Sequence, residues 1–427
     1  MIHQYKNNGY NIVMDVCSGA IHVVDDVTYD VIALYEEKSL EEIENELSYS
    51  KEDIEEAYKE VTSLKEEGLL FTEDIYEDYI KEVKSRKTVV KALCLHIAHD
   101  CNLACRYCFA EEGEYKGHRE LMSAKVGKAA LDFLVANSGN RHNLEVDFFG
   151  GEPTMNFGVV KEVVEYGRSL EEKHNKHFRF TLTTNGVLLN DEIMEFANKE
   201  MDNVVLSVDG RKEIHDYMRP TRNGKPSYDL IMPKFIRFAE SRHQQKYYVR
   251  GTFTNRNLDF SKDVLHLADL GFEQISMEPV VGQPEEPYAI QEKDLPQIFD
   301  EYDRLAKEMI KREKAGKGFN FFHFMIDLTG GPCVYKRLSG CGSGTEYLAV
   351  TPWGDFYPCH QFVGEEQFLM GNVDEGITRP EIRDQFGKCN VYTKEACKDC
   401  FARFYCSGGC AANAYHFQKD INGNYGI

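Results

Sequence analysis

Short apolar runs alternate with amphipathic stretches through the middle of the chain. Six runs have the length and the β-branched or aromatic content of buried strands: residues 91–97, 144–150, 178–184, 203–209, 247–254 and 273–279. The stretches between them place apolar residues three or four positions apart, as helices do, for example after Ser123. Strands and helices that alternate in this way form a parallel sheet with right-handed crossovers. Six units are too few to close an eight-stranded barrel, so the pattern predicts an α/β fold with an open, partial (β/α)6 barrel.

The first 85 residues follow a different pattern. Three short strand-like pieces are followed by helical stretches, two of which begin with capping-box patterns at Ser39 and Ser50. Gly68 ends the second of these, and the segment 68–74 has the composition of a closing strand. This order predicts a winged-helix-like domain over residues 1–85, joined by a charged segment to a central domain over residues 86–320.

The last part of the chain, residues 321–427, has no long periodic segments. It is rich in glycine, cysteine and aromatic residues. Because so short a segment has little apolar core of its own, we expect a loop-rich domain held together by metal clusters.

The composition narrows the classes of partner. The chain of 427 residues has a formal net charge of -21, which argues against a nucleic-acid partner and suits a neutral or basic peptide. Residues 36–78 hold 17 Asp or Glu and 4 Lys, which indicates either a solvated helix face or a docking surface for a basic peptide. No apolar run is long enough to cross a membrane and no signal-peptide pattern is present, so we expect a cytoplasmic protein without membrane contact.

The 13 cysteines are clustered. Cys101, Cys105 and Cys108 follow the first predicted strand, and eight more lie between residues 333 and 410. Since a reducing compartment disfavours disulfides, this clustering indicates metal or iron–sulfur sites. Three thiolates in one short loop suit three corners of a [4Fe–4S] cluster, with the fourth iron open to another ligand. Structural zinc is the alternative for the spacing alone.

Polar motifs follow the next three predicted strands. They are Gly150-Gly151-Glu152-Pro153 (GGEP), the segment TTNG with Asn185, and the segment SVDG with Ser207. In α/β barrels the chemistry gathers at the carboxyl ends of the strands, so we expect these motifs and the cysteine loop at one edge of the sheet. Glu278, at the end of the sixth strand, could face the same cavity. Taken singly, GGEP and Asn185 are also explained as turn residues.

In this order the motifs resemble those of the radical S-adenosylmethionine (SAM) superfamily. Its CxxxCxxC signature is matched by Cys101, Cys105 and Cys108, and the aromatic Phe109 follows. The resemblance implies that these three cysteines are catalytic and bind a [4Fe–4S] cluster, whose open iron takes the amino and carboxylate groups of SAM. It also implies SAM contacts from Gly150, Gly151, Glu152 and Pro153 at the amino group, and from Asn185, Ser207 and Arg219 around the ribose and the methionine carboxylate.

The C-terminal cysteines are similar to those of the SPASM domain, which in its family holds two auxiliary [4Fe–4S] clusters. The resemblance assigns Cys341, Cys359 and Cys410 to the first auxiliary cluster, with Cys333 as a further ligand, and Cys397, Cys400 and Cys406 to the second. A zinc ribbon on the CxxC pairs is the alternative.

The chain departs from the SPASM pattern at one point. The family has a further cysteine after the CxxxC pair, and none follows Cys410 here. We expect that the sequence ends, at Ile427, just before that cysteine, or that Cys389 substitutes for it, or that one iron stays open. Cys389 is also explained as a thiol outside the clusters.

The whole chain resembles radical SAM/SPASM peptide maturases of the thioether-forming (sactipeptide or ranthipeptide) type, most closely those of SCIFF (six-cysteine) peptides. The segments "YCSGGCAANAY" and "GTEYLAVTPWGDFYPCHQF" carry most of this resemblance. It implies that residues 1–85 are a recognition element that binds the leader of a cysteine-rich precursor peptide by strand addition. It also implies SAM and three [4Fe–4S] clusters as cofactors, and a flavodoxin- or ferredoxin-type electron donor. The implied product is a thioether between a peptide cysteine and a carbon of another residue, often threonine.

Two other functions remain open. An enzyme similar to the anaerobic sulfatase maturases would oxidise a Cys or Ser of a protein and would not need residues 1–85. A non-catalytic iron–sulfur protein that binds peptides would leave SAM uncleaved.

Overall fold

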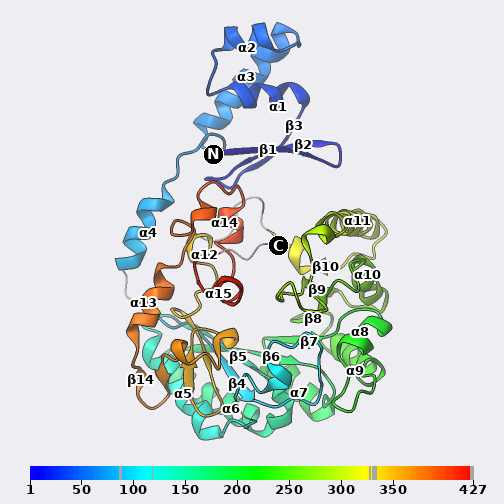
Figure 1. The fold of residues 1–427 in the computed structure, drawn as a ribbon, viewed down its shortest axis with the longest axis vertical. Helices are drawn as coiled ribbons and strands as arrows, with labels where there is room; N and C mark the ends of the chain where they lie inside the picture. Colours follow the sequence, from blue (N-terminus) through cyan, green and yellow to red (C-terminus); the bar gives the residue numbers. More distant parts are fainter. Residues whose placement is uncertain (86–88, 118, 327, 329–333, 424–427) are drawn as a thin grey trace.

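An open sheet runs through the lower part of the molecule in the computed structural model, which describes residues 1–85, 89–117, 119–326, 328 and 334–423 (Figure 1). Its strands lie in the order β10-β9-β8-β7-β6-β5-β4-β11-β12-β13-β14. Six of them match the predicted strands: β4 Ala92–Ala98, β5 Asn143–Gly150, β6 His177–Thr184, β7 Asn203–Ser207, β8 Tyr247–Phe253 and β9 Gln274–Pro279. Each pairs in parallel with the next. The predicted α/β fold with an open sheet is therefore confirmed.

Helices connect these parallel strands and pack against the sheet (Figure 1). They are α5 Ala124–Asn137, α6 Phe157–His174, α7 Asp191–Glu200, α8 Lys212–Met218, α9 Tyr228–Ser241, α10 Ser261–Asp269 and α11 Leu295–Lys314, and the short β10 Asn320–Phe321 follows. In α6 the buried residues recur every three or four positions from Val160 to Leu170. Gly167 belongs to this face, and a Cβ there would lie 2.8 Å from the Phe180 ring of β6. Among the described helices, none is long and apolar enough to cross a membrane.

The N-terminal unit is a three-stranded antiparallel sheet followed by three helices. Its elements are β1 Ile2–Asn7, β2 Tyr10–Asp15, β3 Ile21–Val24, α1 Asp26–Leu34, α2 Leu40–Glu46 and α3 Lys51–Glu66. The predicted helix starts are confirmed, because Ser39 forms a capping box with Glu42 and Ser50 accepts a hydrogen bond from the backbone of Asp53. A fourth helix, α4 Tyr76–Ser85, then leads toward the central sheet.

The predicted closing strand at residues 68–74 is wrong. This segment forms turns and bends. Phe71 has a left-handed backbone with φ of 53°, which interrupts a regular strand. The backbone N–H of Thr72 donates to the Asp15 carboxylate at 2.9 Å, and His22 Nε2 lies 3.1 Å from the Leu69 carbonyl. Backbone groups of this segment therefore form hydrogen bonds with side chains of the N-terminal sheet instead of with a neighbouring strand.

The C-terminal segment extends the central sheet. Its elements are α12 Val334–Ser339, β11 Tyr347–Val350, β12 Asp355–Tyr357, β13 Gly371–Asn372, β14 Gly376–Ile377, α13 Pro380–Lys388, α14 Arg403–Cys406 and α15 Ala411–Gln418. β11 pairs in parallel with β4 over four residues, from Tyr347 opposite Ala92 to Val350 opposite Leu95. Phe356, Phe362 and Phe386 belong to the same buried core as the sheet. The segment is loop-rich as expected, but it shares the core of the central domain as well.

The N-terminal unit rests on the C-terminal segment, with β1 to β3 directly above α14 (Figure 1). A small buried cluster joins them: Val16, Cys17, Ile80, Leu338, Val391 and Phe404. At its margin Arg403 pairs with Asp74 at 2.8 Å, and the ring of His3 stacks on Phe401 with centroids 3.8 Å apart. Apolar contacts and a half-buried ion pair therefore fix this unit against the segment that carries Cys397, Cys400 and Cys406.

Candidate active site

The loop after β4 carries Cys101, Cys105 and Cys108, none of which forms a disulfide with another described cysteine. It is tied to the segment after α8, because Ala104 N donates to Pro220 O at 2.8 Å and Arg106 N donates to Met218 O at 2.9 Å. The bridge between Leu103 and Thr221 continues this pairing. The loop is therefore fixed across the edge of the sheet at which β4 to β7 end.

The three sulfurs converge in a largely buried place. Burial and, to a smaller extent, the nearby Glu152 carboxylate together raise the pKa of Cys101 to about 12. Burial also raises the pKa of Cys105, and there the positive charge of Arg219 acts in the opposite direction while Cys108 and Cys101 add to the rise. A buried thiolate without a positive partner is costly, and iron would supply that partner.

This donor set fits a [4Fe–4S] cluster better than a single ion. In a cubane cluster each thiolate binds a different iron, so the sulfurs stand around a larger body. Three soft sulfur donors on one loop, near enough to affect one another's pKa, match that requirement.

Gly150 and Gly151 let the GGEP loop lie directly against the cysteine loop. Gly150 has φ of 119°, and a Cβ there would lie 2.4 Å from the Ala98 carbonyl oxygen. A Cβ on Gly151 would lie 2.1 Å from the Asp100 carbonyl oxygen. Backbone hydrogen bonds cross the same contact, with Gly151 N to Ala98 O and Glu152 N to Asp100 O both at 2.8 Å. Only residues without a side chain allow this approach.

The Glu152 carboxylate is 1% exposed and faces inward. One oxygen accepts hydrogen bonds from Thr154 Oγ1 at 2.5 Å and Thr184 Oγ1 at 2.8 Å. The other accepts from the backbone N–H of Asn185 at 2.7 Å. Burial raises its pKa, and these hydrogen bonds act in the opposite direction. Glu152 therefore joins the ends of β5 and β6, while Pro153 begins the short 3-10 helix η2, Pro153–Asn156.

The predicted residues after β6 and β7 lie at the same edge. Asn185 is 7% exposed, and its Nδ2 lies 3.6 Å from Cys101 Sγ and donates to Asn102 Oδ1 at 2.7 Å. Ser207 is the last residue of β7 and is half-buried. Glu278, in β9, forms an ion pair with Arg250. The structure therefore brings Asn185 to the cysteines directly.

Asp209 and Tyr107 are part of this site, although sequence reasoning did not select them. Asp209 is 0% exposed and accepts hydrogen bonds from the Tyr107 hydroxyl at 2.7 and 2.9 Å. It also accepts from Arg219 Nε at 3.0 Å. Tyr107 stands between Cys105 and Cys108, so Asp209 holds both the cysteine loop and the predicted SAM-binding cation. The available signal was the position of Asp209 directly after a strand, in the SVDG segment.

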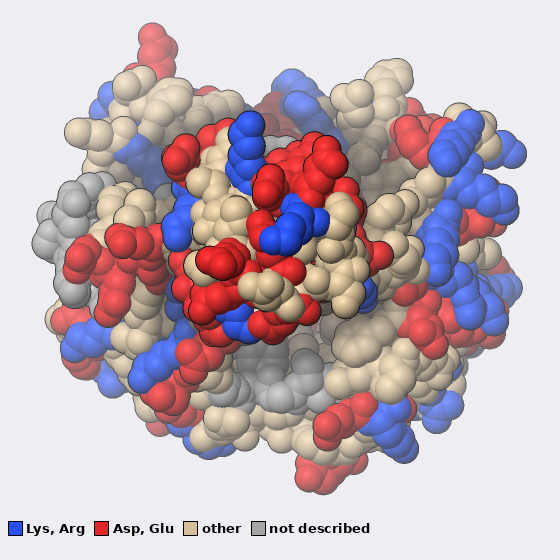
Figure 2. Space-filling view, turned by 90° about the horizontal axis from the view of Figure 1, so that it is seen from above, with Lys and Arg blue, Asp and Glu red and all other residues tan. Residues whose placement is uncertain are grey.

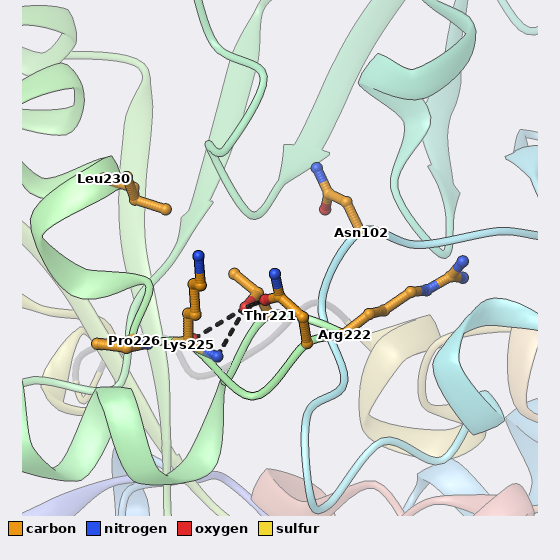
Figure 3. A pocket seen from close by; sticks show the side chains of 7 residues that line it. Asn102, Thr221, Arg222, Lys225, Pro226 and Leu230 are labelled. Atoms are coloured by element: carbon orange, nitrogen blue, oxygen red, sulfur yellow. Dashed lines mark hydrogen bonds between the residues drawn. The ribbon is translucent and has the colours of Figure 1, made fainter.

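An open pocket of about 640 Å³ adjoins the cysteine loop (Figure 3). It is lined by Asn102, Thr221, Arg222, Asn223, Lys225, Pro226 and Leu230. Two of these lining residues are linked, because Thr221 Oγ1 accepts a hydrogen bond from the Lys225 backbone N–H at 3.0 Å. None of the three cysteines lines this pocket, so we do not assign SAM to it.

Cys341, Cys359 and Cys410, the described cysteines of the first expected auxiliary set, lie near one another. Burial raises the pKa of Cys359, and the nearby Cys410 and Cys341 raise it further. Cys359 is 8% exposed, whereas Cys341 is exposed at the surface of the fold. Cys333 lies outside the described residues. The fit to a cluster therefore rests on three sulfurs here.

The second auxiliary set also gathers. Burial raises the pKa of Cys397, and Cys406 and Cys400 contribute to the rise. Cys389 lies close to both sets, since Cys341 and Cys397 each raise its pKa, but its Sγ donates to the Ile421 carbonyl at 3.4 Å. That hydrogen bond favours a thiol outside the clusters.

The exposed face of the N-terminal unit is acidic. Figure 2, which looks down on this unit, shows Asp and Glu side chains crowded over it with a few Lys among them. Exposed acidic residues on α2 and α3 are Glu41, Glu42, Glu46, Glu52, Asp53, Glu55, Glu56, Glu60 and Glu66. Surface pairs such as Lys38 with Glu46 balance only part of this charge.

Comparison with known proteins identifies relatives of the chain. A family model described as the radical SAM superfamily matches residues 95–242, the span of the cysteine loop and the motifs through Arg219. An uncharacterized protein of Methanocaldococcus jannaschii is 30% identical over 301 residues, which cover 69% of this chain and 94% of that protein. The cysteine-type anaerobic sulfatase-maturating enzyme of Clostridium novyi is 25% identical over 346 residues, or 76% of this chain and 89% of the enzyme.

Two solved structures share the fold. Native anSMEcpe with bound AdoMet aligns with a TM-score of 0.65 at 20% identity, over 78% of this chain and 92% of its own. Streptococcus suis SuiB bound to precursor peptide SuiA aligns with a TM-score of 0.55 at 17% identity, over 99% of this chain and 97% of its own. The second likeness therefore includes the N-terminal unit.

Proposed function

This chain belongs to the radical SAM superfamily, and we propose that it is a peptide maturase that forms thioether crosslinks in a cysteine-rich precursor peptide. The crosslinks would join a peptide cysteine to a carbon of another residue, often threonine. One observation carries the proposal: the loop of three cysteines, the GGEP loop and Asn185 meet at one edge of an open sheet. Two more groups of cysteines in the C-terminal segment support a maturase of the radical SAM/SPASM type.

Cys101, Cys105 and Cys108 would hold a [4Fe–4S] cluster that takes SAM at its open iron, and the C-terminal sets would hold two auxiliary clusters. When bound, these groups would supply one-electron chemistry. This chemistry comprises cleavage of SAM to methionine and a 5'-deoxyadenosyl radical, and removal of a hydrogen atom from the substrate. It also comprises uptake of the electron that is left when sulfur and carbon join. For each crosslink the peptide loses one hydrogen atom to 5'-deoxyadenosine and one proton from its thiol. The substrate is thereby oxidised, and the bond formed is carbon–sulfur.

The residues of this chain position SAM and exclude water. Arg219, held by Asp209, would bind the methionine carboxylate through its guanidinium. The loop Gly150–Pro153 would meet the amino group, and Asn185 and Ser207 would lie near the ribose and the carboxylate. Burial of Cys101 keeps water from the reacting centre.

The N-terminal unit would bind the leader of the precursor peptide. β3 is an edge strand of its sheet, and Val23 on it is 65% exposed, so a further strand has room to add. The acidic face of α2 and α3 would attract basic residues of the peptide (Figure 2). A flavodoxin- or ferredoxin-type protein would supply the electron, in the cytoplasm.

The test is a reaction of reduced enzyme with SAM and a cysteine-rich peptide, with and without its leader. We expect 5'-deoxyadenosine and a product lighter by two hydrogen atoms per crosslink, in which the crosslinked cysteine no longer reacts with iodoacetamide. Omission of the leader should lower the yield. Cleavage of SAM without this peptide product would contradict the thioether proposal.

A second candidate is favoured by the similarity to a sulfatase-maturating enzyme. An enzyme of that kind would oxidise a Cys or Ser to an aldehyde, which a hydrazide probe captures and which leaves no crosslink. The alignment with anSMEcpe leaves about a fifth of this chain unmatched, whereas that with SuiB covers nearly all of it. That difference supports the peptide maturase.

The non-catalytic alternative predicts that no 5'-deoxyadenosine forms.

A further inference from the structure

A buried lysine lies between the two auxiliary sets of cysteines. Lys394 is 2% exposed. Its backbone carbonyl accepts a hydrogen bond from Cys397 N at 3.0 Å, and its side chain passes Gly408, two residues before Cys410. It lines a cavity of about 250 Å³ together with Cys341 and Cys389. Lys394 therefore lies next to residues of both auxiliary sets of cysteines.

Lys394 has no carboxylate partner in the part of the chain that the structure describes. Asp384 lines the same cavity but forms no ion pair with it. Lysine is almost never fully buried unless it is paired, because an ammonium loses its hydration when it is buried. A buried lysine that lines a cavity without a carboxylate partner therefore indicates that an anionic group belongs there.

The cysteines around the cavity identify that anionic group. Cys341 of the first set and Cys389 line the same cavity as Lys394. Cys397 of the second set is hydrogen-bonded through its backbone to Lys394, and the Lys394 side chain passes Gly408, which lies between Cys406 and Cys410 in the sequence. Thiolate-bound iron–sulfur clusters are anionic, and both fit the sulfur sets described above.

We propose that Lys394 is the counter-charge of the auxiliary clusters and raises their reduction potentials. The inference rests on the proposed function, in which an auxiliary cluster takes up the electron released as the thioether forms. A fixed positive charge stabilises the reduced, more negative form of a nearby cluster. Lys394 thereby favours transfer of that electron from the substrate to the cluster, and the substrate is oxidised while the cluster is reduced.

The test is a redox titration of the anaerobic holoenzyme, followed by electron paramagnetic resonance, with iron and sulfide analysis of each sample. The variants are Lys394→Met and Lys394→Gln, which remove the charge, and Lys394→Arg, which keeps it. The matched control is Lys398→Met, because Lys398 is 55% exposed and already paired with Glu395 at 2.6 Å. We expect wild-type iron content throughout, and a potential lower by at least about 59 mV in the two neutral variants, a tenfold change in a one-electron equilibrium.

Wild-type potentials in both neutral variants would overturn the inference, as would an equal shift in Lys398→Met. Loss of iron from both neutral variants, with Lys394→Arg intact, would also overturn it, because the lysine would then be needed to assemble the clusters. The proposed function fails in a different way. In that case the potentials of the auxiliary clusters still differ between the wild-type protein and the neutral Lys394 variants, but the wild-type protein forms no crosslinked peptide.

Discussion

Arg219 and Asp209 form an ion pair, with Nε and Oδ1 3.0 Å apart, beside the loop that carries the three cysteines. Asp209 is fully buried and also holds the Tyr107 hydroxyl, within the cysteine loop. One carboxylate therefore orients both the cation proposed to bind SAM and the loop proposed to bind iron. The proposed SAM contact of Arg219 and the proposed cluster-binding loop therefore depend on the same side chain.

Replacement of Asp209 should disturb both functions. We expect Asp209→Asn to lower the free energy of unfolding by about 3 kcal/mol, because Arg219 stays buried without a counter-charge. Urea unfolding and SAM affinity measure the two effects. Asp229→Asn is the control, since Asp229 is 71% exposed in its pair with Lys212 and should cost less than about 1 kcal/mol. Equal losses in the two variants would count against the orienting role.

A methyl group on Gly151 should separate the GGEP loop from the cysteine loop. Its Cβ would lie 2.1 Å from the Asp100 carbonyl oxygen, so one of the loops must move. We expect Gly151→Ala to reduce SAM cleavage by about 100-fold, as misplacement by about 1 Å does at other active sites. Gly158→Ala, where a Cβ meets nothing within 4 Å, should keep full cleavage. Full cleavage by Gly151→Ala would show that the close approach is not required.

His215 should make the stability of the fold depend on pH. Burial lowers the pKa of His215 to about 4, and its ring is neutral because Nδ1 accepts a hydrogen bond from Asp209 N at 3.3 Å. Between pH 4 and the ordinary value of about 6.5 the unfolded chain binds more protons, so stability falls as the pH falls.

We expect this single group to cost about 2 kcal/mol at pH 5 relative to pH 7. His215→Gln should remove that part of the pH dependence of the free energy of unfolding, whereas the exposed His174→Gln should keep it. An unchanged slope in His215→Gln would assign the pH dependence to other groups.

Asp74 should anchor the N-terminal unit. It pairs with Arg403 at 2.8 Å and accepts a hydrogen bond from the Tyr392 hydroxyl at 2.8 Å. We expect Asp74→Ala to speed amide hydrogen exchange in β1 to β3 roughly tenfold, since the buried Arg403 loses its carboxylate partner. Mass spectrometry of the peptides measures this rate. Glu36→Ala, which breaks the exposed pair with Lys65, should leave the rate unchanged, and a similar increase in both would refute the anchor.

The central sheet could be predicted because each strand carries its own local signal. All six strands lie within a few residues of the apolar runs, and the caps at Ser39, Ser50 and Ser123 mark helix starts correctly. The segment 68–74 was misjudged because its backbone is satisfied by side chains distant in sequence, Asp15 among them. The addition of β11 to β4 joins residues about 250 positions apart, which no local pattern encodes.

The parts of the candidate site that consist of sequence motifs could be predicted. The cysteine loop, GGEP and Asn185 were found from spacing and position after strands, and the structure brings them together. Asp209 and Lys394 were missed because each is a single charged residue whose significance comes from burial. Glu152 was expected to face an ammonium, and only the fold shows that its oxygens accept hydrogen bonds from Thr154, Thr184 and Asn185.

The most direct measurement combines metal analysis with SAM cleavage in anaerobically purified protein. The account predicts iron and sulfide in the wild-type protein and formation of 5'-deoxyadenosine when SAM and a strong reductant are added. A variant with Ala at Cys101, Cys105 and Cys108 should retain the iron of the C-terminal segment and form none. Wild-type protein that holds zinc in place of iron, or that leaves SAM intact under the same reductant, would contradict the account.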